Sequence, residues 1–94
     1  MLSSKSRAAL RAEAHHLSPA VHVGHHGVTD TVRQSLDDAL RTRELVKIQF
    51  TKNSDVDVRT VANELGRAMN ADVVQVIGRT ATLYRENPEL HTER

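Results

Sequence analysis

The residues best suited to chemistry in this chain form one tetrapeptide, Gly24-His25-His26-Gly27. Two glycines at this spacing let the backbone turn tightly and let another backbone approach without a Cβ in the way. The flanking residues predict a strand before the tetrapeptide and a helix after it, and the unpaired N–H groups of a helix's first turn attract phosphate. The setting indicates a loop that holds a nucleic-acid backbone, as the GxxG loop of KH domains does. Taken alone the tetrapeptide is a weak signal, because most such sequences are ordinary glycine-rich turns.

The histidines raise a second hypothesis, a metal site, because imidazole is a common ligand of zinc, nickel and copper. Five of the six histidines lie between His15 and His26. His15 and His16 are adjacent, as are His25 and His26, and adjacent side chains diverge rather than converge on one ion. The chain has no cysteine and no clearly placed carboxylate to complete a ligand set. We therefore expect surface and loop histidines, with no metal and no cofactor.

Catalytic groups have less support still. Asp37 and Asp38 are neighbours on a predicted helix and are expected to be solvated, while the serines near the N-terminus suit helix caps. The sequence contains no Gly-x-Ser-x-Gly motif and no phosphate-loop lysine. We therefore do not expect an enzyme or a small-molecule substrate.

The distribution of charge says more than its total, because the formal net charge is only +1. The first 35 residues carry four basic against two acidic side chains, and the remainder carries nine against ten. An anion-binding surface is thus expected toward the N-terminal third, where Lys5, Arg7 and Arg11 are candidate contacts. Aromatic residues make up 2% of the chain, which argues against stacking of bases on a row of rings.

Length and hydropathy narrow the class of protein. A chain of 94 residues has room for one domain with a modest core. No apolar run approaches the roughly 20 residues that cross a bilayer. Residues 1–11 also lack the apolar stretch of a signal peptide. We expect a cytoplasmic protein with no membrane partner.

The elements that must position these residues follow from propensity, periodicity and caps. Helices are predicted at residues 3–16, from a cap at Thr29 to about residues 41–43, and from a cap at Asp55 to a left-handed Asn70. Strands are predicted where β-branched residues gather or alternate with polar ones, namely at residues 20–23, 44–51, 72–77 and 81–85, with a hairpin at residues 78–80.

The resulting order, α-β-α-β-α-β-β, predicts an α/β fold with a four-stranded mixed sheet and helices packed mainly on one face. The uncovered face would present a polar surface available to a ligand, with His22, Lys47, Gln49 and Gln75. Residues 1–85 are expected to form the single domain. Residues 86–94 contain many charges and little to bury, which predicts a flexible tail.

Three blocks of sequence carry a resemblance to a known family, and together they run in register over nearly the whole chain, from about residue 2 to residue 85. The blocks are HLSPAVHVGHHGVT at residues 16–29, RELVKI at residues 43–48, and VQVIGRT at residues 74–80 with LYR at residues 83–85. Together they resemble the CRM domain, named for chloroplast RNA splicing and ribosome maturation, whose stand-alone bacterial members are the YhbY-like proteins. The blocks are far more specific than the tetrapeptide alone.

The resemblance implies an RNA-binding module whose fold is similar to the C-terminal domain of translation initiation factor three. By position, the loop from Gly24 to Gly27 would clamp the RNA backbone, and Arg79 and Arg85 would add basic contacts. Lys47 is a further candidate, although all three basic residues are equally consistent with solvated strand positions. Bacterial members of the family are associated with precursors of the large ribosomal subunit.

Two functions of different classes follow from this reading. The first is binding of ribosomal RNA in precursors of the large subunit, by a monomer that uses the loop and the adjoining basic surface. The second is a protein-interaction module that docks on a ribosomal protein or assembly factor without touching RNA. Salt dependence separates them, because contacts to phosphate weaken as salt rises.

Overall fold

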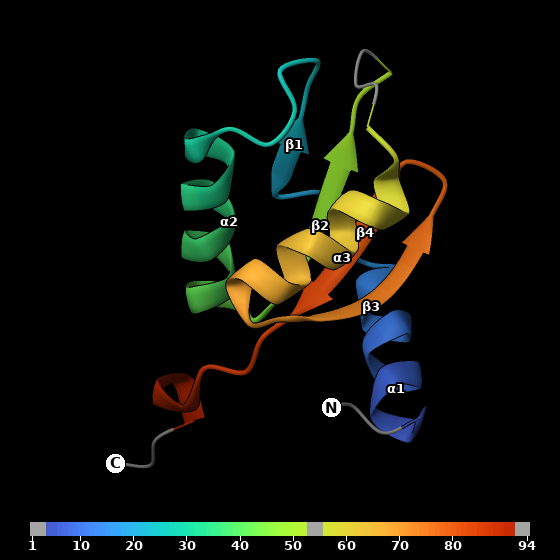
Figure 1. Ribbon diagram of the computed structural model, residues 1–94. Coiled ribbons are helices and arrows are strands. Elements are labelled where there is room, and N and C mark those ends of the chain that lie inside the picture. Colours follow the sequence, from blue (N-terminus) through green and yellow to red (C-terminus); the bar gives the residue numbers. More distant parts are fainter. Residues whose placement is uncertain (1–3, 53–55, 92–94) are drawn as a thin grey trace.

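The chain is seen in a computed structural model that describes residues 4–52 and 56–91. Within these residues the elements follow the predicted order, so the α-β-α-β-α-β-β prediction is confirmed (Figure 1). The elements are α1 (Ser4–Ala14), β1 (Val21–Val23), α2 (Asp30–Arg43), β2 (Leu45–Phe50), α3 (Val58–Met69), β3 (Asp72–Ile77), β4 (Thr80–Tyr84) and a short 3-10 helix, η1 (Pro88–His91).

The four strands of the described residues form one mixed sheet in the order β1-β2-β4-β3. β1 is parallel to β2, and β4 lies antiparallel between β2 and β3. The directions of β1, β2 and β3 therefore agree, and these strands finish at the same end of the sheet, at Val23, Phe50 and Ile77. We call this the loop end, because the connections into α2 and α3 leave from it (Figure 1).

Helices α2 and α3 cover one face of the sheet and enclose the main core. Leu36 and Leu40, four positions apart on α2, are fully buried in one cluster with Ile48 and Phe50 of β2. Spacing by four places side chains on the same helical face, so these two leucines form one buried stripe. Burial of each such side chain contributes about 2 kcal/mol to folding.

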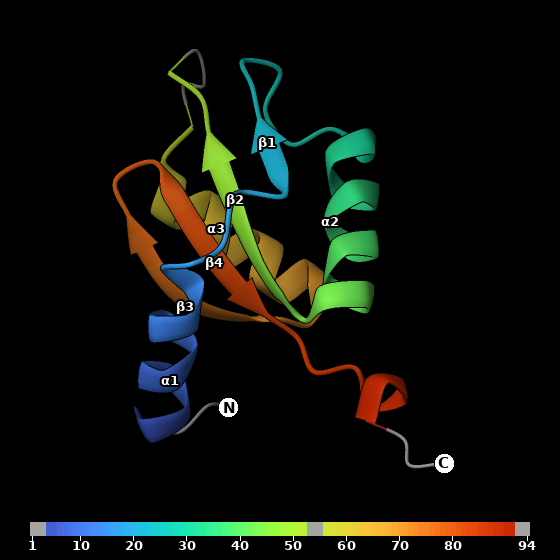
Figure 2. The same ribbon diagram turned by 180° about the vertical axis from the view of Figure 1, so that it is seen from behind.

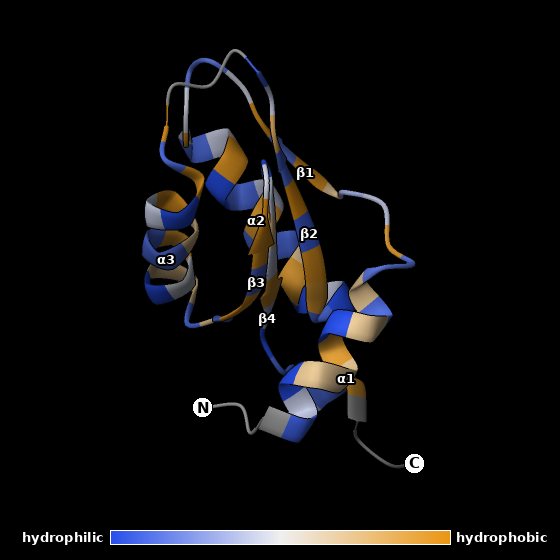
Figure 3. Ribbon diagram, turned by 90° about the vertical axis from the view of Figure 1, so that its right-hand side faces the viewer, coloured by the Kyte–Doolittle hydropathy of each residue, from blue (hydrophilic) through white to orange (hydrophobic). Residues whose placement is uncertain are grey.

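Helix α1 packs on the opposite face, where it covers only the end of the sheet away from the loops (Figures 2 and 3). Ala14 of α1 is fully buried with Leu45 of β2 and Val74 of β3, and Leu10 and Tyr84 pack around them. Two helices thus cover one face and one helix covers part of the other. This agrees with helices packed mainly on one face and leaves the rest of the α1 side of the sheet open.

Helix α3 begins two residues later than the sequence predicted. Its N-cap is Asp57, whose carboxylate accepts a hydrogen bond from the Thr60 hydroxyl at 2.7 Å. Val56, just before the cap, packs against the core. The predicted cap, Asp55, lies outside the described residues. At the other end the prediction is confirmed, because Asn70 closes the helix with a left-handed φ of 59°.

The hairpin between β3 and β4 is tighter than predicted. Thr80 belongs to β4 and pairs with Ile77, which leaves Gly78 and Arg79 as the turn. Gly78 has a φ of +57°, a conformation that glycine adopts without a Cβ penalty.

The start of the predicted tail contacts the domain. The Asn87 backbone N–H donates to a carboxylate oxygen of Glu44 at 2.8 Å, and its side-chain amide donates to the Arg41 carbonyl at 2.6 Å. These bonds tie the chain after β4 to the C-terminal end of α2. The flexibility of residues 86–94 as a whole stays a prediction. None of the helices in the described segments has the length and apolar character needed to cross a membrane.

Candidate nucleic-acid interface

The loop from Gly24 to Gly27 is a hydrogen-bonded turn that projects from the loop end of the sheet (Figure 1). The Gly27 N–H donates to the Gly24 carbonyl at 2.9 Å, which closes the turn. His25 and His26 at its tip are exposed, and their ring centroids lie 4.0 Å apart. The turn therefore presents two polar rings to solvent on a short, closed backbone.

The two glycines of this loop differ from a glycine needed for internal packing. A Cβ added at Gly24 or Gly27 would meet no atom within 4 Å, whereas one added at Gly66 would lie 3.0 Å from the Ala71 carbonyl oxygen. Gly27 has a φ of +72°, which explains a glycine there on conformational grounds. Nothing in the described fold explains Gly24 in this way. Its bare backbone is open to a partner.

Helix α2 starts directly after the loop and turns its positive end toward the same region. The Thr29 hydroxyl accepts from the Val32 N–H at 3.2 Å and caps the helix. The N–H groups of Asp30 and Thr31 have no hydrogen-bond partner among the described residues. The Asp30 side chain is fully exposed and pairs weakly with Arg33, at 3.7 Å. Two free donors thus stand beside the loop, along with one carboxylate that would oppose an anion.

Arg79, a predicted RNA contact, does lie at the loop end. Its Nε donates to the carbonyls of Phe50 and Thr51, each at 3.2 Å, and its Nη2 donates to Thr51 at 2.7 Å. The Phe50 N–H in turn donates to the Arg79 carbonyl at 2.8 Å. The guanidinium thus fastens the hairpin to the end of β2 and adds a positive charge near the loop.

Arg7, by contrast, is held at the opposite end of the molecule. Its Nη1 donates to the carbonyl of Val73 and, at 3.4 Å, to that of Val74. These carbonyls belong to an irregularity in β3, where the register with β4 shifts between Val73 and Gln75. The bond anchors α1 to the sheet through a bulge.

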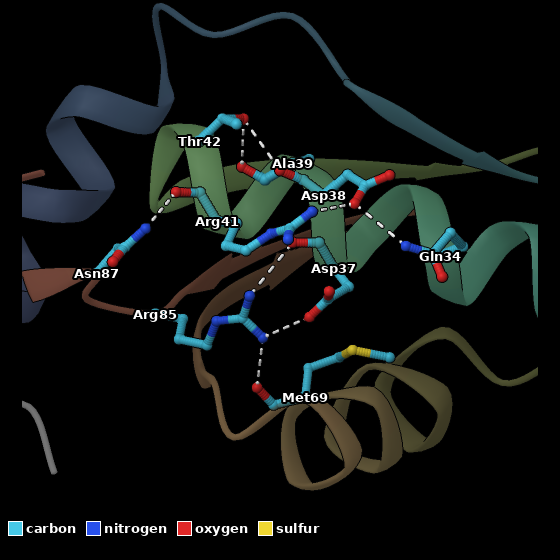
Figure 4. Close-up of polar contacts among 9 residues, drawn as sticks. All are labelled: Gln34, Asp37, Asp38, Ala39, Arg41, Thr42, Met69, Arg85 and Asn87. Carbon is cyan, nitrogen blue, oxygen red and sulfur yellow. Dashed lines mark hydrogen bonds and ion pairs between the residues drawn. The ribbon is translucent and has the colours of Figure 1, made fainter. Parts of the chain in front are cut away.

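Arg85 also bonds within the fold (Figure 4). Its Nη1 donates to the Asp37 carboxylate at 3.0 Å and to the Met69 carbonyl at 2.9 Å, and its Nη2 donates to the Asp37 carbonyl at 3.2 Å. It thereby joins the C-terminal half of α2 to the end of α3. Asp37, expected to be solvated, is instead only 40% exposed and paired, because the chain after β4 passes beside α2.

The other predicted contacts are spread over the molecule. Lys5 is exposed and Arg11 half-buried on α1, which lies far from the loop end in both Figure 1 and Figure 2. Lys47 lies on the open part of the sheet face, between those regions. Of the predicted basic residues, the fold brings Arg79 near the loop and leaves Lys5, Arg7, Arg11 and Arg85 away from it.

The open part of the sheet face carries two rows of side chains that run across the strands. The row nearer the loop end holds His22, Gln49, Thr80 and Ile77, and the next row holds Lys47, Thr82 and Gln75. The four residues predicted for this face are all in these rows. Thr80, Thr82 and Ile77 were missed, because only the pairing of β4 between β2 and β3 brings them there.

Tyr84 is not placed to stack on a base, since its ring packs with Leu45 and Val74 under α1. Burial raises the pKa of Tyr84, and the carboxylates of Glu44 and Glu86 raise that pKa further. A search of the described residues for three or more His, Asp or Glu side chains grouped closely enough to hold a metal ion finds no such group.

The fold and the loop together define a small α/β domain with a GxxG turn at a helix N-terminus. The chain matches the family model of the CRS1 / YhbY (CRM) domain over residues 2–85. The chain therefore belongs to this family, and the predicted resemblance is confirmed.

Several relatives are similar over nearly their full length. The Bacillus subtilis protein named "Probable RNA-binding protein YqeI" is 39% identical, with 95% of this chain and 93% of that protein covered. A Haemophilus influenzae protein named RNA-binding protein is 34% identical, with 94% and 89% covered. The solution structure of the hypothetical protein SAV1595 from Staphylococcus aureus superposes with a TM-score of 0.79 at 34% identity, covering 93% of this chain and 91% of that one.

Proposed function

We propose that this protein binds RNA, and that the loop from Gly24 to Gly27 and the first turn of α2 hold the RNA backbone. The observation that carries the proposal is the bare backbone at Gly24, where an added Cβ would meet nothing within 4 Å. A phosphate that approaches there reaches the free N–H groups of Asp30 and Thr31. The relatives named as RNA-binding proteins support the same partner.

The RNA in question is ribosomal RNA in precursors of the large subunit, and the role is in ribosome assembly within the cytoplasm. This part of the proposal rests on the family to which the chain belongs. With a net charge of +1, the chain binds through a few phosphate contacts. It acts as a monomeric binding module and not as an enzyme. Affinity is therefore modest and salt-sensitive.

The test is binding of the purified chain to fragments of large-subunit ribosomal RNA over a series of salt concentrations. Gly24→Asp is the sharpest variant, because Gly24 has no positive φ and open space around it, so the fold tolerates the change. Asn63→Asp, exposed on α3, is the matched control with the same added charge. We expect Gly24→Asp to lower affinity by about tenfold or more and Asn63→Asp to change it little, since only the first charge faces the phosphates.

Two results would overturn the proposal. One is an absence of RNA binding by the wild-type chain at low salt, which would favour docking on a ribosomal protein or assembly factor instead. The other is equal affinity for RNA in the wild type and a folded Gly24→Asp variant, which would remove the loop from the interface.

A further inference from the structure

The open face of the sheet contains a hollow that the loop hypothesis does not use. It has a volume of about 290 Å³ and is lined by residues of the two rows and by the residue directly after α1, namely His15, Lys47, Gln75, Ile77, Thr80 and Thr82. Small-molecule sites usually measure roughly 300–1,000 Å³. A hollow of this size fits a single flat heterocycle rather than a longer ligand.

Thr82 forms the floor of this hollow and is the most informative residue in it. It is only 1% exposed, yet its hydroxyl has no hydrogen-bond partner among the described residues. Among the described residues, the fully buried side-chain atom without a partner is the Thr51 hydroxyl and not that of Thr82, so the Thr82 hydroxyl still reaches the hollow. A hydroxyl there that the fold does not bond can donate to, or accept from, a ligand that lies in the hollow.

The side chains on either side of Thr82 are also available to bond a ligand. Lys47 and Gln75 lie directly across from it on the neighbouring strands, and neither side chain has a bonded partner in the described part of the chain. Gln49 in the next row differs, since its amide donates to the Phe50 carbonyl at 3.3 Å and accepts from Thr80. The fold thus uses the amide of Gln49 and leaves that of Gln75 free.

The chemistry of the hollow matches one unpaired nucleotide. A glutamine amide offers a donor and an acceptor side by side, as does the edge of a base. Ile77, which is 58% exposed, offers an apolar surface to the face of the ring, and Lys47 offers a cation to a phosphate. None of the seven side chains in the two rows is acidic, so a polyanion meets no opposing charge there.

The hollow is also continuous with the proposed clamp. The row nearer the loop end begins at His22, two residues before Gly24 on the same chain segment. A strand of RNA held at the loop and continuing along the sheet reaches the hollow without crossing covered surface, because α1 packs only at the far end (Figure 2).

We propose that the hollow over Thr82 holds one unpaired base of the bound RNA, with Gln75 and Thr82 bonding to its edge and Lys47 to an adjoining phosphate. This inference rests on the proposed RNA-binding function and deepens it. The loop holds the backbone, and the hollow gives a preference among bases, because only base edges carry sequence information.

The test measures binding of short homopolymeric RNA oligonucleotides of adenosine, cytidine and uridine. Thr82→Val removes the hydroxyl at nearly constant volume, and Thr82→Ser restores it. Gln75→Ala removes the amide, and Gln34→Ala, exposed on α2 of the opposite face, is its matched control. We expect the wild type to prefer one base, and Thr82→Val and Gln75→Ala to lose about fivefold in affinity for that oligonucleotide. Thr82→Ser and Gln34→Ala keep the preference.

The salt series separates the two proposals. Thr82→Val and Gln75→Ala leave the slope of log affinity against log salt unchanged, while Lys47→Met lowers its magnitude by about 0.7, the effect of one phosphate contact on a single strand. Suppose that Gly24→Asp abolishes binding. If the wild type then shows no base preference, or if Thr82→Val and Gln75→Ala keep the wild-type preference, the proposal for the hollow is overturned and the proposal for the loop stands. If the wild type binds none of the oligonucleotides or ribosomal fragments, both proposals fall.

Discussion

The guanidinium of Arg85 and the carboxylate of Asp37 lie 3.0 Å apart although 48 residues separate them in the sequence. The arginine side chain is 20% exposed and also bonds to the Met69 carbonyl. It therefore joins the C-terminal half of α2 to the end of α3. Its surroundings are those of a structural residue, although its sequence position suggested an RNA contact.

Replacing Arg85 by methionine should lower the free energy of unfolding by about 1–3 kcal/mol, because several partly buried charged hydrogen bonds are lost. The affinity for RNA should stay within about twofold of the wild type, since Arg85 lies away from the loop end. Urea unfolding and RNA titration measure the two quantities. A stable variant that no longer binds RNA would instead make Arg85 a direct contact.

Arg7 allows a matched comparison on α1. Arg7→Ala removes the bonds to Val73 and Val74 and should cost about 1–2 kcal/mol of stability. Lys5→Ala, an exposed position two residues earlier, should change stability by less than about 0.5 kcal/mol. Urea unfolding of both variants provides the measurement. Equal, small losses in the two variants would show that the bond to the bulge contributes little.

Asp30 is the carboxylate that opposes an anion at the start of α2. Asp30→Asn should raise the affinity for RNA by about two- to fivefold, the effect of an exposed charge close to a phosphate. It should also lower stability by about 0.5 kcal/mol, because a negative charge near a helix N-terminus is favourable. Asp38→Asn, exposed further along the same helix, is the control in RNA titrations at low salt. Equal gains in the two variants would mean that only net charge matters.

Tyr84 gives a test at alkaline pH, because it is the only tyrosine in the chain. Burial raises its pKa above the ordinary value of 10.0, so the folded protein holds this proton more tightly than the unfolded chain does. Its contribution to stability is complete below pH 10 and is lost as the pH rises through the folded-state pKa. The tyrosinate absorbance should therefore rise later in the folded protein than in urea. Tyr84→Phe should remove the matching part of the alkaline loss of stability, and coincident titrations in the two states would contradict the argument.

The elements of the fold were predictable because their causes are local. Alternation along β2, the spacing of Leu36 and Leu40 and the left-handed residue Asn70 all act within a few residues. The start of α3 was placed too early, because Asp55 and Asp57 are equally good caps by type. The structure gives Asp57 as the cap, directly after Val56, which packs against the core.

The site was less predictable, because its residues depend on pairing between distant strands. The sequence identified the loop from its two glycines, and it identified Lys47 and Gln75 from alternation. No sequence pattern identifies Thr82, because its position between Lys47 and Gln75 follows from the strand order β1-β2-β4-β3. The internal bonds of Arg7 and Arg85 could not be predicted for a similar reason, because their partners include backbone carbonyls far away in the sequence, and carbonyls have no sequence signature.

The bulge in β3 has a consequence for the behaviour of the protein at high concentration. β3 is an edge strand, and a flat, unbroken edge is a template on which a strand from a second molecule can assemble into an aggregate. Here the ladder is interrupted between Val73 and Gln75, and Arg7 occupies two carbonyls at that point. The same bond that anchors α1 therefore also occupies part of this edge and disfavours the pairing of a second strand there.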